Sequence, residues 1–195
     1  MTKIVAIALI SVVTAVAVVG CAEDSPVVVV SASESVKVAR GSYLVKIMGC
    51  NDCHTPWKMG PNGPEPDTDR FLSGHPEQMG PLPAAGAQGP WLWAGAPTNT
   101  AYSGPWGVSY TANLTPDQNT GLGIWTEEMF VSAIRTGRHM GTSRPINPTM
   151  PWPAYRNATD DDLKAVYAYL RTIEPIVNHV PDYQPPAEGR PTATH

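Results

Sequence analysis

Three segments of the chain carry the hydrophobic spacing of a helix. The first covers residues 35–49, where apolar side chains recur three and four positions apart: Val36, Ala39, Tyr43 and Ile47. This spacing predicts that these four side chains face the core. Gly41 interrupts the segment, at a cost of about 1 kcal/mol relative to alanine. A close crossing by another helix would explain this glycine, and an indifferent position facing solvent is the alternative.

The other two predicted helices have recognisable ends. Residues 126–136 begin at Thr126, a suitable N-cap, and stop at Gly137, with an apolar face made of Met129, Phe130, Ala133 and Ile134. Residues 160–172 follow a second threonine cap, Thr159. Their apolar positions recur at i, i+3, i+4 and i+7, which is typical of a half-buried helix: Leu163, Val166, Tyr167 and Leu170.

Composition and charge narrow the class of protein. Proline (21) and glycine (17) together make 38 of 195 residues, against a usual ~12%. Only 15% of residues are charged, which excludes a coiled coil, and the lack of a Gly-X-Y repeat excludes collagen. A hydrophobic content of 42% suffices for a core, and a net charge of −4 argues against a nucleic-acid partner.

The N-terminus predicts export. An uncharged apolar run of sixteen residues, 4–19, follows Lys3; it is short for a membrane span of ~20 residues and suits the core of a signal peptide. The run ends at Val18-Val19-Gly20-Cys21, which resembles a bacterial lipobox. We therefore expect residues 1–20 to be a cleaved signal, Cys21 to carry a lipid, and residues 21–33 to tether a periplasmic domain to the membrane. An uncleaved N-terminal anchor is the alternative.

The other two cysteines lie in a motif with known chemistry. Cys50-Asn51-Asp52-Cys53-His54 has the C-x-x-C-H spacing of c-type haem attachment. Two thiols three positions apart lie on one side of a helical turn, where each can form a thioether with a haem vinyl group, and His54 follows as the first axial ligand. A thioredoxin-like redox pair, a zinc site and a plain disulfide are the alternatives, and none of them accounts for the histidine. One motif predicts one covalent haem c.

The second axial ligand is predicted in a proline-rich loop. Met150 lies within residues 147–153, where three prolines suppress regular structure and leave a stiff segment just before the last helix. Such a loop can hold a thioether at a fixed place. Met140 and His139 are the alternative ligands, and a methionine that merely fills the core is the remaining interpretation of Met150.

The segment between the motif and the second helix has a different character. Residues 55–112 contain ten prolines and nine glycines and show no helical period. They also contain four tryptophans: Trp57, Trp91, Trp93 and Trp106. We interpret the segment as an ordered loop, packed by these indoles, that wraps the haem edge and contacts a partner; a decoration without function is the alternative.

The order of these features resembles the cytochrome c family over residues 35–180. Several short segments carry the resemblance: Arg40-Gly41-x-Tyr43-Leu44, Asn113-Leu114-Thr115-Pro116-Asp117, Thr120-Gly121-Leu122-Gly123-x-Trp125-Thr126, Met150-Pro151-Trp152 and Tyr167-Ala168-Tyr169-Leu170-Arg171. They are similar to cytochrome c subunits that partner periplasmic dehydrogenases. The resemblance implies a mainly α cytochrome c fold, with three to five helices around one haem and long Pro/Gly-rich loops.

The resemblance also implies roles for single residues. His54 and Met150 become the axial ligands, Gly41 packs against an aromatic side chain of the last helix, Tyr167, and Asn113 lies near the haem. The domain then spans residues 34–180. The proline-rich segment 181–195 is expected to be a flexible C-terminal tail.

An iron with both axial positions filled has no open site for a substrate. We therefore expect a one-electron carrier or electron-transfer subunit of a respiratory or dehydrogenase chain rather than an enzyme. Its partners would be redox proteins, such as a dehydrogenase, a terminal oxidase or another electron carrier, together with the membrane through the lipid. The alternatives are a peroxidase-like haem enzyme or gas sensor, with His75 or His139 at a labile sixth site, and a structural role in a membrane complex.

Overall fold

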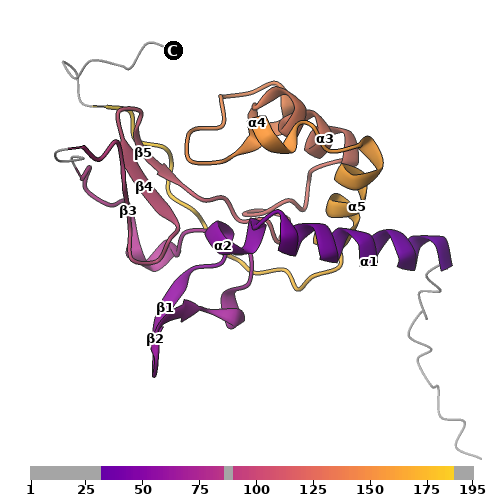
Figure 1. The fold of residues 1–195 in the computed structure, drawn as a ribbon, viewed down its shortest axis with the longest axis horizontal. Coiled ribbons are helices and arrows are strands. Elements are labelled where there is room, and N and C mark those ends of the chain that lie inside the picture. The colour runs from indigo at the N-terminus through magenta and orange to yellow at the C-terminus, as the bar shows by residue number, and fades with distance from the viewer. Residues whose placement is uncertain (1–31, 86–89, 187–195) are drawn as a thin grey trace, which may run out of the picture. The chain divides into compact units, whose positions relative to one another are not determined.

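The computed structural model describes residues 32–85 and 90–186 (Figure 1). The described part contains five α-helices, which are α1 (Ala32–Ile47), α2 (Cys50–His54), α3 (Glu127–Thr136), α4 (Trp152–Tyr155) and α5 (Asp160–Leu170). Short 3-10 turns lie at Thr68–Arg70 (η1), Glu77–Met79 (η2) and His139–Gly141 (η3). The predicted signal peptide, Cys21, most of the tether and the end of the predicted tail lie outside the described residues.

The expected mainly α fold is wrong, because the segment taken for a loop forms two antiparallel sheets and makes the fold mixed α/β. One sheet pairs β1 (Trp57–Gly60) with β2 (Gly63–Pro66). The other joins β3 (Ala94–Gly95), β4 (Ala101–Gly104) and β5 (Gly107–Tyr110) in that order. These strands are at most four residues long, and all four residues of β4 are buried, so no alternation of polar and apolar positions reveals them.

Helices α1 and α5 cross in close contact at Gly41. A Cβ atom at that position would lie 1.9 Å from the carbonyl oxygen of Ala165 and 2.8 Å from the Cβ of Tyr169, so only glycine allows the approach. The prediction of a helix crossing is thus confirmed. The aromatic residue beside Gly41 is Tyr169, however, and not Tyr167, whose hydroxyl donates to the carbonyl of Trp125 at 2.5 Å.

The apolar face predicted for the first helix is wrong. Val36, Tyr43 and Ile47 are 70%, 53% and 59% exposed, whereas the buried positions of α1 are Gly41, Leu44 and Val45. The helix carries two apolar stripes, and the buried stripe is the one that includes the glycine. Close contact with α5 there buries Leu44 and Val45 against the aliphatic side chains of α5, including Leu163, Val166 and Leu170.

The predicted helices 126–136 and 160–172 are confirmed as α3 and α5. The hydroxyl of Thr126 accepts from the backbone N–H of Met129 at 3.2 Å, and Thr159 caps α5 in the same way through Asp162 at 3.1 Å. Gly137 ends α3 with a left-handed φ of 66°. The expected faces pack on the core except for Met129, which is 38% exposed.

The chain after α5 returns along the sheet side of the domain. Asn178 in this segment is fully buried and joins it to residues 70–77. Its side-chain nitrogen donates to the carbonyls of Ser73 and His75, and its side-chain oxygen accepts from Arg70 and from the N–H of Glu77. In the C-terminal segment, drawn in yellow in Figure 1, Gln184 then pairs with Val108 of β5. Residues 181–186, the first part of the expected tail, are therefore attached to β5. Within the described ranges no helix is long and apolar enough to cross a membrane.

Candidate functional site

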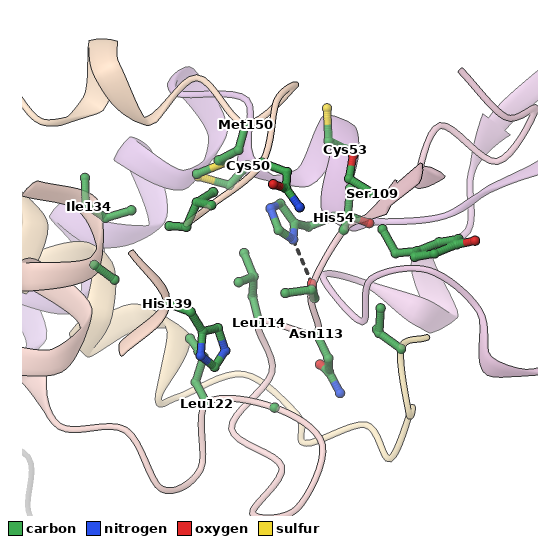
Figure 2. A pocket seen from close by; sticks show the side chains of 18 of the residues that line it. Cys50, Cys53, His54, Ser109, Asn113, Leu114, Leu122, Ile134, His139 and Met150 are labelled. Carbon is green, nitrogen blue, oxygen red and sulfur yellow. Dashed lines mark hydrogen bonds between the residues drawn. The ribbon is translucent and has the colours of Figure 1, made fainter. Parts of the chain in front are cut away.

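A cavity of about 370 Å³ lies between the helices and the three-stranded sheet (Figure 2). Its size is typical of sites that bind small molecules or cofactors. Helix α2 forms one wall, β5 and the following residues 111–114 form a second, and α3 with the loop before α4 closes it. Four of the predicted site residues line this one cavity: Cys50, Cys53, His54 and Met150. The fifth, Cys21, lies outside the described residues.

Helix α2 places the cysteines and the histidine together. Gly49, with a left-handed φ of 68°, ends the connection from α1 and lets the chain turn into the short helix. Cys50 and Cys53 both carry free thiols. Residues three positions apart lie on the same side of a helix, so both thiols lie beside the cavity. His54 is the last residue of α2.

The imidazole of His54 is oriented by the backbone. Its side chain is only 8% exposed, and its Nδ1 lies 2.7 Å from the carbonyl oxygen of Ala112 (Figure 2, dashed line). Because that carbonyl can only accept, Nδ1 carries the proton and Nε2 keeps a free lone pair. Burial lowers the pKa of His54 below its usual value, so the ring is neutral at pH 7 and suited to bind a metal.

The environment of Cys50 differs from that of a redox-active thiol. Burial raises the pKa of Cys50 to about 11, whereas thiols that react by exchange have lowered pKa values. Tyr102 of β4 also lines the cavity. Its burial, together with neighbouring Cys53, raises the pKa of its hydroxyl. The described residues also contain no cluster of three or more His, Cys, Asp or Glu side chains that could hold a metal ion.

Met150 reaches the cavity from the loop before α4. It is half-buried and packs against the main core. The hydroxyl of Ser109 in β5 donates to the carbonyl of Pro148 at 2.8 Å and ties this loop to the sheet. Of the alternative ligands, His139 lines the cavity and Met140 does not. His75, proposed for a labile sixth site, is fully buried away from the cavity, between Thr100 and the carbonyl of Gly80.

The indoles of residues 55–112 do not form the cavity wall. None of the four tryptophans in that segment lines it, and Trp91 and Trp93 are 74% and 44% exposed. The segment contributes Tyr102, Ser109 and Tyr110 instead, and the indole at the cavity is Trp125. The sequence did not predict this wall, because β4 and β5 lie in the segment that was interpreted as an ordered loop packed by indoles. Asn113, for which the resemblance implies a place near the haem, lines the cavity. Its amide nitrogen already donates to the carbonyl of Ile176 and the hydroxyl of Thr120.

Several curated relatives of this chain are cytochrome subunits of dehydrogenases. The chain is 30% identical over 150 residues to the fructose dehydrogenase cytochrome subunit of Gluconobacter japonicus, covering 76% of this chain and 24% of that protein. It is 29% identical over 157 residues to the cytochrome c subunit of the quinone-type alcohol dehydrogenase of Gluconobacter oxydans, covering 78% and 25%.

A third match concerns the cytochrome c subunit of the gluconate 2-dehydrogenase of Pantoea cypripedii. It is 31% identical over 133 residues, which are 68% of this chain and 22% of that protein. The chain thus spans about a quarter of the length of these curated relatives. No family model matches the sequence. The similarities support a cytochrome c-like subunit.

Proposed function

We propose that this chain binds one haem c and transfers single electrons as a subunit or partner of a dehydrogenase. The observation that carries the proposal is the convergence of Cys50, Cys53, His54 and Met150 on one cavity. These residues lie up to 100 positions apart in sequence and come from two separate elements, so their meeting is not a consequence of the motif alone.

The residues of the cavity fit such a group. Two free thiols lie on one helical turn, a neutral imidazole presents an unused Nε2, and a thioether lies on a separate loop. Aliphatic side chains make much of the remaining wall, among them Leu114, Leu122 and Ile134. A haem c would use every one of these donors. It would form thioether bonds with Cys50 and Cys53 and take His54 and Met150 as its axial ligands.

Each residue then has a defined task. Ala112 holds the His54 ring in the tautomer that leaves Nε2 free, and Ser109 holds the loop of Met150 through Pro148. Around a bound haem, the aliphatic wall would exclude water and so reduce the rearrangement of solvent that accompanies a change in charge. When bound, a haem with His and Met ligands supplies one-electron exchange between ferric and ferrous iron at a raised potential.

The partner follows from the relatives. They are cytochrome subunits of dehydrogenases acting on fructose, alcohol and gluconate, and the described part of this chain contributes a single C-x-x-C-H motif. We propose that this chain receives electrons from a dehydrogenase and passes them to another redox protein.

We further propose that the domain is held at the periplasmic face of a membrane by a lipid on Cys21. The support is the apolar run 4–19 that ends at a lipobox-like sequence. The wild-type chain should begin at Cys21 and carry the added mass of a lipid, and Cys21→Ala should lose that mass and keep residues 1–20. A wild-type chain that keeps its first 20 residues and carries no lipid would favour an uncleaved anchor.

Absorption spectroscopy of the ferric protein tests the axial pair. The weak long-wavelength band that arises from sulfur-to-iron charge transfer should be present, should vanish in Met150→Ala, and should persist in the matched variant Met140→Ala, whose side chain lies outside the cavity. A native protein that lacks this band and binds carbon monoxide or cyanide rapidly would instead be a haem enzyme or gas sensor with an open sixth position.

A further inference from the structure

Arg144 is exposed to solvent and lines the cavity, and its charge has no partner among the described residues. Every other arginine in the described part of the chain has a partner for its guanidinium. For example, Arg40 donates to Asp162, Arg135 to Asp160, and Arg138 to the carbonyl of Ser143. Arg144 forms no hydrogen bond or ion pair through its guanidinium within residues 32–85 and 90–186. A guanidinium has five donors in a planar fork suited to a carboxylate, so a carboxylate is the natural partner for it here.

His139 lies beside Arg144 and also lines the cavity. The two residues are joined through the backbone, since the N–H of His139 donates to the carbonyl of Arg144 at 2.9 Å. The His139 ring packs edge-on against Trp125, with centroids 5.0 Å apart and an interplanar angle of 87°. Neither ring nitrogen has a hydrogen-bond partner among the described residues.

Arg144 and His139 lie close enough for the charge of the guanidinium to act on the imidazole. Burial, and secondarily the charge of Arg144, lower the pKa of His139. The only carboxylate that lines the cavity in the described ranges is Asp182, and no ion pair joins it to Arg144. A guanidinium and a neighbouring imidazole line one cavity, and neither has a side-chain acceptor among the described residues, so together they suit a negatively charged ligand.

The place of this pair in the cavity indicates which anion. Figure 2 shows Cys50 and Cys53 on one side of His54, and His139 on the other side near Leu122. In a haem, the two propionate side chains leave the ring at the edge opposite the two vinyl groups. A haem joined at its vinyl edge to Cys50 and Cys53 would therefore direct its carboxylates toward the His139 side.

We infer that His139 and Arg144 form the carboxylate subsite of the cavity, which binds the haem propionates and neutralises part of their charge. This inference rests on the proposed haem binding. It assigns His139 as a hydrogen-bond donor and not as an axial ligand, and it makes both residues positioning groups that set the reduction potential. Neutralised propionates favour the ferrous form, because an unpaired negative charge near the iron stabilises the ferric form.

The test is a spectroelectrochemical titration of the holoprotein and four variants. Arg144→Gln should shift the midpoint potential downward, and Arg144→Lys, which keeps the charge, should restore most of the shift. Arg138→Gln is the matched control, since Arg138 lies in the same loop, points to the Ser143 carbonyl and does not line the cavity; its potential should equal that of the wild type. His139→Gln should keep the sulfur-to-iron band and lower the potential.

The outcomes separate this inference from the proposed function. A wild-type protein without covalent haem overturns both. A haem-loaded Arg144→Gln protein that keeps its charge-transfer band and its wild-type potential overturns only the carboxylate subsite, as does a shift of equal size in Arg138→Gln. Loss of the band in His139→Gln would make His139 a ligand or a support of the iron and also contradict the assignment.

Discussion

The contact between α1 and α5 gives a sharp test of the fold. Replacing Gly41 by alanine adds one methyl group, which would lie 1.9 Å from the carbonyl oxygen of Ala165. That neighbour is backbone and cannot rotate aside, so the two helices must separate. We therefore expect Gly41→Ala to destabilise the protein, although alanine is the better helix former.

The magnitude follows from two opposing effects. Alanine is favoured over glycine inside a helix by about 1 kcal/mol, while inserting a methyl group into a packed contact costs about 1–3 kcal/mol. A backbone neighbour places the cost near the upper end of that range. The net loss in free energy of unfolding should be about 2 kcal/mol, which is roughly a 30-fold change in the folding equilibrium.

Urea unfolding followed by circular dichroism measures this change through the midpoint at constant slope. Ala39→Gly is the matched control, because Ala39 is exposed on the same helix and should lose about 1 kcal/mol from helix propensity alone. An increase in stability of about 1 kcal/mol in Gly41→Ala would mean that Gly41 faces open space, and it would refute the crossing.

Two further predictions concern a helix cap and a buried histidine. Thr126→Ala should cost about 1 kcal/mol in unfolding free energy, because it leaves the Met129 N–H without an acceptor. Thr142 is exposed and its side chain forms no hydrogen bond with the described residues, so Thr142→Ala should be neutral in the same urea assay. Burial lowers the pKa of His75 below its usual 6.5, so below pH 6.5 the unfolded chain binds a proton that the folded chain does not, and stability should fall as the pH drops. The fall should be shallower in His75→Gln, and an unchanged pH profile in that variant would show that His75 titrates equally in both states.

The described helices were predictable where local signals were complete. Thr126 with Gly137, and Thr159 with its three following aspartates, supply both an end and a period, and α3 and α5 begin where those signals indicate. In α1 the period alone was insufficient. The stripe of Val36, Tyr43 and Ile47 has helical spacing but remains exposed, because the position of Gly41 against α5 decides which face is buried.

The sheets and the cavity walls depend on contacts distant in sequence. Strands β4 and β5 have four residues each and meet at a turn between Gly104 and Gly107, so each is too short for a pattern. The local motif predicts what Cys50, Cys53 and His54 can do. It does not predict that the carbonyl of Ala112, 58 residues later, orients the imidazole, because only the folded chain brings β5 beside α2.

Covalent attachment of haem at the Cys50–His54 motif is the central claim, and intact-protein mass spectrometry tests it most directly. The full chain, expressed in a bacterium that carries out cytochrome c maturation, should gain the mass of one haem, which resists extraction by acidified acetone. The double variant Cys50→Ala/Cys53→Ala should lack this covalent mass. A wild-type chain without added mass, or with a haem that the solvent removes, would contradict the account.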